Sequence, residues 1–298
     1  MPFFLFYATG LFLLDSHINQ NNFLYGSIKK RERLQTISSP KMVFIGGSSM
    51  AFSLDSKKIE KELGYSVVNM GLIADVGLRY MLLESEEYLK EGDAVVVGAE
   101  YEQFLDYFYG RQTLVALLFD INKDYYQKLD IESSVQLFEP MHKYVLRKVS
   151  YNLLNSQAES TEVYSKNSFN EYGDVVAHWT KEPQKYIHNY TMEKVINPDS
   201  FSFLRSFKEK MQSRNITFIL IPPPIQQTQF DINKEIIKKI QDKLQTNNLP
   251  YIETSNTYTF ADSLFFDTPY HLNKQGVDIR TAYIISDIQN CLRQDKVK

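Results

Sequence analysis

Two serines follow a short apolar run near the start of the chain, in a context that suits a nucleophile. Residues 41–47 read KMVFIGG, and Ser48 and Ser49 come next. Two glycines let the chain turn sharply off a strand, so either serine would stand at a helix N-terminus. A serine placed there can attack a carbonyl group, and its backbone N–H can help to hold an oxyanion.

A histidine near the other end of the chain stands close to a carboxylate. His271 lies in the segment FDTPYHLN, residues 266–273, and Asp267 precedes it by four residues. An aspartate oriented toward an imidazole sets its tautomer and stabilises the imidazolium form. Asp262 and Asp278 are alternative orienting carboxylates. Serine, histidine and aspartate together indicate acyl transfer, provided that the two segments meet in space.

The glycine–serine turn also permits other interpretations, namely a phosphate-binding loop or a purely structural turn. A Walker loop needs Gly-Lys-Ser/Thr and a dinucleotide loop needs G-x-G-x-x-G, and neither pattern is present. The nucleophile elbow G-x-S-x-G also fails, because Met50 stands where its last glycine should be. A phosphate- or nucleotide-binding domain would further require a basic cluster near 46–49, which the sequence does not offer.

Short apolar runs separated by amphipathic segments predict the elements that position these residues. The runs cover residues 41–47, 65–71, 93–101, 216–224 and, more weakly, 250–255. Helical patterns cover residues 55–64, 78–89, 198–211, 231–244 and 277–292. Val/Ile-rich runs of this length suit strands buried on both faces. The alternation predicts an α/β domain with a parallel sheet, in which ligands bind at the carboxyl ends of the strands.

The interval from about residue 105 to 197 interrupts this alternation. It is rich in Tyr, Phe, Asn and Lys, and the segments 114–119 and 141–154 have helical patterns. We interpret it as one long insertion between the third and fourth strands, and we expect it to form one wall of the cleft. Its polar segment 170–179, NEYGDVVAHW, is a further candidate for approaching the site.

The N-terminal stretch 2–14 carries no charge but is shorter than the roughly twenty residues that span a bilayer. Its composition suits a signal anchor, but no Lys or Arg precedes it, and the basic residues that follow at 29, 30, 31 and 33 would point the wrong way for an exported chain. We therefore expect a truncated signal anchor whose upstream basic portion is missing. A buried N-terminal helix or strand is the alternative. The expected organisation is an apolar segment and linker over 1–34 and a folded domain over 35–298. Localisation is then expected to be extracytoplasmic, either membrane-anchored or periplasmic, with membrane contact only through the N-terminal segment.

Composition excludes several classes of function. A net charge of −3 leaves no basic excess for binding nucleic acid. The lone cysteine, Cys291, excludes an internal disulfide and a cysteine-based zinc cage, and the five histidines are scattered. We therefore expect no metal and no cofactor.

The serine and histidine motifs, together with a glycine after the second run, resemble the SGNH (GDSL-type) hydrolase superfamily. Gly46-Gly47-Ser48 matches its first block, G-D-S; Gly71 matches the second; and His271 matches the histidine of the last, Asp-x-x-His. The resemblance spans residues 41–104 and 214–292. It implies a three-layer, flavodoxin-like fold with a central parallel sheet of about five strands. The chain looks most similar to the cell-envelope branch, which includes the D-alanine transfer protein and polysaccharide O-acetylation proteins.

The resemblance implies specific roles. Ser48 would be the nucleophile, Ser49 its neighbour, His271 the base and Asp267 the orienting carboxylate. The backbone N–H groups of Ser48 and Gly71 would hold the oxyanion.

Three positions depart from the family's pattern. Gly47 replaces the aspartate of G-D-S, and Glu100 stands where the family has an asparagine that donates to the oxyanion. An ionised carboxylate cannot donate and would repel an oxyanion, so another donor replaces it, Glu100 is protonated, or the site binds something else. Asp267 lies four residues before His271 instead of three, so the loop must bulge.

The implied activity is that of a serine esterase or an O-acyltransferase. Its substrate would be an acyl ester, above all an acetyl ester, of a cell-envelope or extracellular polysaccharide, or another ester. An acyltransferase would also need an acyl donor, such as a membrane acyl-donor protein. The alternative is a non-catalytic glycan-binding or scaffold protein of an envelope polysaccharide pathway.

Overall fold

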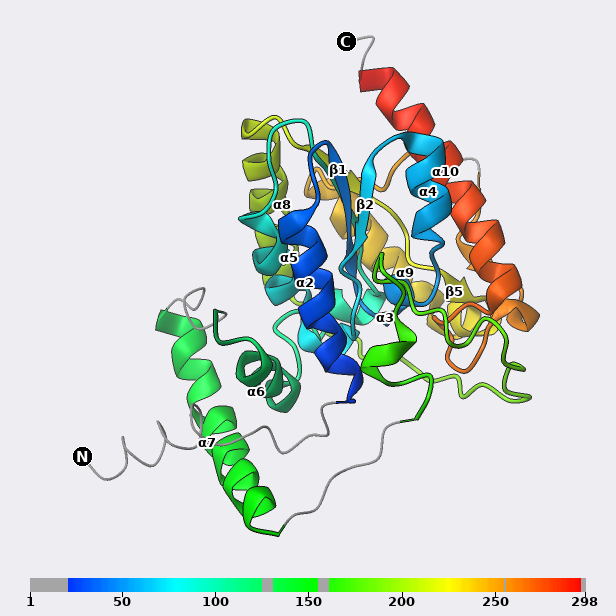
Figure 1. Ribbon diagram of the computed structural model, residues 1–298. Helices are drawn as coiled ribbons and strands as arrows, with labels where there is room; N and C mark the ends of the chain where they lie inside the picture. Colours follow the sequence, from blue (N-terminus) through cyan, green and yellow to red (C-terminus); the bar gives the residue numbers. More distant parts are fainter. Residues whose placement is uncertain (1–20, 125–130, 155–160, 255, 296–298) are drawn as a thin grey trace.

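The fold is a three-layer, flavodoxin-like α/β arrangement around a parallel sheet (Figure 1). The computed structural model describes residues 21–124, 131–154, 161–254 and 256–295. The four-stranded sheet has the order β2-β1-β3-β4, and every neighbouring pair is parallel. Its strands are β1 (Lys41–Gly46), β2 (Ser66–Asn69), β3 (Ala94–Gly98) and β4 (Thr217–Leu220). The four stronger apolar runs are thereby confirmed as strands.

Alternate residues of the central strand β1 pack into two separate cores, one on each face of the sheet. Met42 and Phe44 contact the core beneath α4 (Ser56–Leu63) and α10 (Lys274–Asp295). Val43 and Ile45 contact the opposite core. That side is covered by α2 (Gly26–Thr36), α5 (Leu78–Glu86) and α8 (Pro198–Ser213), while α9 (Gln227–Thr246) also packs into this core (Figure 1).

The segment 250–255 was expected as a weak fifth strand of the main sheet, but its described residues 250–254 form no strand. The N–H of Ile252 donates to the carbonyl of Leu220 at 2.7 Å, so the segment follows the edge of β4 without forming a ladder. A separate two-stranded parallel sheet is formed by β5 (Ile225–Gln226) and β6 (Thr259–Phe260).

Residues 23–34, which we expected to be part of a linker, belong to the folded core. A short 3₁₀ helix, η2 (Phe23–Tyr25), leads into α2. Leu24 and Leu34 are both buried in the core that also contains Val43 and Ile45 of β1. The apolar stretch 2–14 lies outside the described residues.

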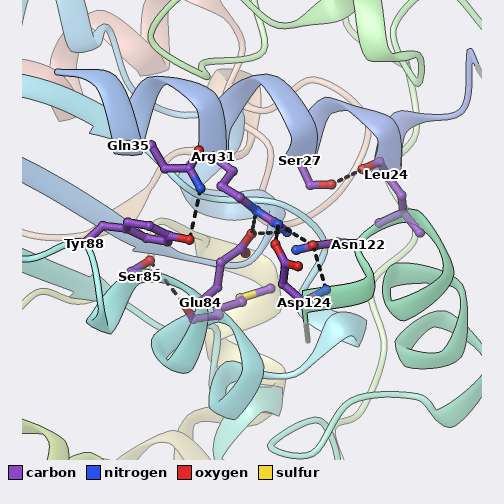
Figure 2. A network of polar contacts seen from close by, with 10 residues as sticks. Leu24, Ser27, Arg31, Gln35, Glu84, Ser85, Tyr88, Asn122 and Asp124 are labelled. Carbon is purple, nitrogen blue, oxygen red and sulfur yellow. Dashed lines mark hydrogen bonds and ion pairs between the residues drawn. The ribbon is translucent and has the colours of Figure 1, made fainter. Parts of the chain in front are cut away.

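Polar contacts fix α2 to α5 in the same layer and to the segment that follows α6 (Gln112–Ile121) (Figure 2). The Arg31 guanidinium contacts Glu84 of α5 at 3.3 Å and Asp124 at 3.2 Å. Its Nη1 also donates to the side-chain carbonyl of Asn122, directly after the last residue of α6, Ile121. The helix that carries the chain into β1 is therefore tied to the insertion as well as to the sheet.

The insertion between β3 and β4 is helical, as the sequence predicts. It contains η4 (Tyr101–Phe104), α6 (Gln112–Ile121), α7 (Ile131–Leu154) and η6 (Lys166–Ser168), with a long irregular stretch before α8. Arg111 anchors its start to Asp75 of η3 (Ala74–Val76) at 3.2 Å. Lys148 of α7 pairs with the buried Asp120 of α6 at 2.8 Å. None of the helices in the described part of the chain combines the length and apolarity needed to cross a bilayer.

Candidate active site

The segments that carry Ser48 and His271 meet at the carboxyl ends of the strands. Both residues line one cavity of about 340 Å³, together with Asp267 and Glu100. Ser48 begins the short helix α3 (Ser48–Ala51) directly after β1, and Glu100 follows β3. Because these two strands are adjacent and parallel, their carboxyl ends bring both side chains to one edge of the sheet.

His271 and Asp267 are joined by a hydrogen bond. The Nδ1 atom of His271 lies 2.8 Å from Oδ1 of Asp267, and both side chains are almost fully buried. The turn between them absorbs the four-residue spacing, because the His271 N–H donates to the carbonyl of Thr268 at 3.3 Å and to its hydroxyl at 3.2 Å. The loop bulges as required, and Asp267 is the residue that orients the ring.

Two aromatic residues complete the surroundings of the imidazole. The ring of Phe52 is stacked on His271, with centroids 3.9 Å apart and planes inclined by 5°. The Tyr164 hydroxyl donates to Oδ2 of Asp267 and lies 3.3 Å from Nδ1 of His271. Burial would raise the pKa of Asp267, but the hydrogen bond and charge of His271 and the Tyr164 hydroxyl together hold it below its ordinary value. An ionised Asp267 thus faces Nδ1 and leaves Nε2 for a proton acceptor role.

Ser48 has a different partner. Its hydroxyl donates to Oε1 of Glu100 at 3.3 Å, and the backbone N–H of Ser49 donates to the same oxygen at 2.7 Å. The carboxyl group of Glu100 is thus bound at the start of α3, where an oxyanion would be expected.

Gly47 explains why this carboxyl group fits. A Cβ atom at position 47 would lie 2.4 Å from Oε1 of Glu100 and 2.8 Å from its Cδ atom. Real Cβ contacts do not become so short, so any larger residue would push Glu100 away. Gly47 stands where the G-D-S pattern has aspartate, and Glu100 stands where the pattern has asparagine. The two differences are therefore coupled, because the glycine makes room for the glutamate.

Burial dominates the electrostatics of Glu100. Only 5% of the residue is exposed, and burial, with a further contribution from the nearby Glu102, raises its pKa to about 7. Hydrogen bonds from Ser48 and Ser49 act in the opposite direction. The group therefore changes its charge close to neutral pH.

Several residues that line the cavity were not identified from the sequence. Glu102 accepts hydrogen bonds from Tyr190 at 2.6 Å and Tyr270 at 2.9 Å, and the insertion contributes Tyr107, His188 and Tyr190 to the wall. The wall formed by the insertion was predicted, but these residues were not. Of these residues, only Glu102 had a signal in the sequence that could have identified it, because it lies two positions after Glu100.

Four carboxyl groups contribute to the wall of the cavity. Asp75, Glu100, Glu102 and Asp267 all line the cavity, and among the described residues no lysine or arginine does so. The cavity thus favours a neutral or cationic ligand over an anionic one.

Gly71 does not line this cavity. Its N–H donates to the side-chain oxygen of Asn69 at 2.9 Å, and a Cβ atom there would lie 2.6 Å from the backbone nitrogen of Ala51. Gly71 thus lets β2 approach α3 closely, and the N–H expected to hold an oxyanion is already bonded.

The polar segment 170–179 supports the site from behind. Asp174 is buried and binds both Ser56, at the start of α4, and the Asn69 side chain at 2.8 Å. His178 is buried against Phe52 and lies 2.9 Å from the Leu272 carbonyl, and burial lowers its pKa to about 4. Neither residue lines the cavity.

The alternative orienting carboxylates lie elsewhere: Asp262 accepts from Thr228 and Asp278 pairs with Lys274. Within the described ranges no group of three or more His, Cys, Asp or Glu residues is arranged to hold a metal ion. Comparison with protein-family models and with curated proteins finds no match to this chain.

Proposed function

We propose that this protein is a serine esterase or O-acyltransferase that acts on acyl esters of a polysaccharide through Ser48, His271 and Asp267. One observation carries the proposal: a serine at the start of a helix and a bonded histidine–aspartate pair line the same cavity. The excess of carboxyl groups in the wall suits an uncharged ester better than a phosphorylated or uronic one.

The chemistry begins when the Ser48 hydroxyl leaves Glu100 and donates to Nε2 of His271. Ser48 Oγ then attacks the ester carbonyl while His271 takes the proton, and Asp267 stabilises the resulting imidazolium. Collapse of the tetrahedral intermediate expels the alcohol, which takes the proton back, and leaves an acyl-serine. Water releases the acid in an esterase, and a sugar hydroxyl forms a new ester in a transferase.

Glu100 has a specific place in this scheme. When protonated, it is a neutral group that can donate a hydrogen bond to the oxyanion, as the asparagine of the resembling family does. When ionised, it repels the oxyanion and retains Ser48 as a hydrogen-bond donor. The raised pKa of Glu100, about 7, supports a neutral form in weakly acidic conditions.

The test is hydrolysis of 4-nitrophenyl acetate by the purified protein. We expect turnover that Ser48→Ala abolishes and that Ser49→Ala retains. Ser49 is a matched control because it is the adjacent serine and its hydroxyl is buried without a partner. Equal rates in the wild type and Ser48→Ala would contradict the proposal.

One observation favours a second candidate function, a non-catalytic glycan-binding protein. Glu100 occupies both the Ser48 hydroxyl and the Ser49 N–H, so the groups needed for attack and for charge stabilisation are engaged. This candidate predicts no hydrolysis between pH 5 and pH 8 together with retained binding of glycans.

A further inference from the structure

A second cavity, of about 350 Å³, lies on the other side of the segment that walls the active-site cavity. The segment 183–190 contributes His188 and Tyr190 to the first cavity and its remaining members Pro183 to Ile187 and Asn189 to the second. Gln226 of β5 lines the second cavity opposite this segment. The volume lies at the lower end of the range of small-molecule sites, about 300–1,000 Å³.

Two buried amide groups in this cavity have unused hydrogen-bonding capacity. Oε1 of Gln226 and Oδ1 of Asn189 are both buried and have no hydrogen-bond partner. Gln226 as a whole is only 4% exposed. A buried polar atom without a partner costs about 1–3 kcal/mol, so such atoms are usually paired with a ligand or water.

The lining defines the chemistry of the ligand. Amide groups match hydroxyl groups, which both donate and accept hydrogen bonds. Tyr186 lines the cavity with 78% of its surface exposed, which is unusual for a large aromatic residue and provides a face on which a sugar ring can stack. Lys185 and Asp262 also line it with opposite charges, and Asp262 is already bonded to Thr228. The ligand is therefore neutral and rich in hydroxyl groups.

We propose that this second cavity is a binding subsite for a neutral sugar residue, recognised by Gln226, Asn189 and Tyr186. This site is separate from the proposed catalytic cavity, but residues of both cavities are attached to the same loop. The Gln184 N–H donates to the Phe266 carbonyl at 2.7 Å and the Gln226 N–H to the Pro269 carbonyl at 2.9 Å. Both carbonyls belong to the loop that carries Asp267 and His271, so one glycan chain can contact both cavities.

The experiment is a titration by saturation-transfer NMR with a panel of neutral methyl glycosides: glucoside, galactoside, rhamnoside and N-acetylglucosaminide. Gln226→Leu removes the amide at similar volume, and Tyr186→Ala removes an exposed ring that cannot affect folding strongly. Tyr107→Ala is the matched control, because Tyr107 lines only the first cavity. We expect at least one glycoside to bind, with affinity about three- to tenfold weaker in both second-cavity variants and unchanged in Tyr107→Ala.

Two results would overturn the proposal. One is the absence of binding by every glycoside. The other is binding that is weakened by Tyr107→Ala and unaffected by Tyr186→Ala and Gln226→Leu, which places the sugar in the first cavity. Because the readout is binding, neither result depends on ester hydrolysis, so this test is separate from that of the proposed function.

Discussion

The two sides of the active-site cavity differ in how complete they are. On the side of the C-terminal loop, His271 is bonded to Asp267, stacked on Phe52 and supported by Tyr164. On the side of β1, the Ser48 hydroxyl is bonded to Glu100 instead of the imidazole. The proposed acid–base pair is thus joined by a hydrogen bond, while the proposed nucleophile is held by a group whose pKa is raised to about 7.

The two sides of the cavity also differ in the kind of group that holds each side chain in place. The histidine side is held together by the carboxylate of Asp267, the stacked ring of Phe52 and a short turn. The serine side depends on a buried carboxyl group next to Glu102, whose own pKa is raised by burial. Each prediction below perturbs one side and leaves the other intact.

The largest effect is expected on the histidine side. His271→Ala removes the base, so we expect kcat for 4-nitrophenyl acetate to fall by at least about a thousandfold. His188→Ala is the matched control, because His188 lines the same cavity but is exposed. A similar loss in both variants would show that His271 has no special role, and kcat in steady-state assays decides between these outcomes.

The next effect concerns Glu100 and the stability of the fold. Its pKa is near 4.5 when unfolded and about 7 when folded, so the folded state binds the proton more tightly. Its contribution to stability is greatest below pH 4.5 and is lost as pH rises through 7. Glu100→Gln stays neutral, so we expect its free energy of unfolding to decline less between pH 5 and pH 8, by at most about 3 kcal/mol.

Urea unfolding at a series of pH values measures this difference. Glu62→Gln, a change at an exposed glutamate of α4, serves as the control and should follow the wild type. Parallel pH curves for the wild type and Glu100→Gln would mean that Glu100 is ionised throughout. Activity provides a second readout: we expect the wild type to lose rate above pH 7, where Glu100 ionises, and Glu100→Gln to keep its rate.

The smallest effect is expected from Tyr164. Tyr164→Phe removes one hydrogen bond to Asp267, whose other bond, to His271, remains. We expect kcat to fall only a few-fold, as a net loss of about 1 kcal/mol implies. Steady-state kinetics with Tyr190→Phe as a matched tyrosine control measures it, and a loss of a hundredfold or more would mean that Tyr164 itself takes part in proton transfer.

The sequence was sufficient for the four strands of the main sheet and for placing Ser48 and His271 at one cavity, because ligand sites of parallel sheets lie at the carboxyl ends of the strands. It also identified Asp267, although only the Thr268 turn explains the spacing. It could not show that Gly47 and Glu100 depend on each other, since this requires the distance between segments far apart in the chain. Tyr164 and Tyr190 carry no local pattern, and residues 23–34 were misassigned to a linker because their charges hide the buried Leu34.

The most direct test of a reactive serine in this cavity is labelling with a fluorophosphonate probe, followed by mass spectrometry of the digested protein. Attack by Ser48 Oγ on phosphorus expels fluoride and leaves a phosphonylated serine, provided that His271 accepts the proton. We expect label on the peptide that contains Ser48 in the wild type, and none there in His271→Ala. Absence of label at Ser48 in wild-type protein at pH 6 as well as pH 8 would contradict it.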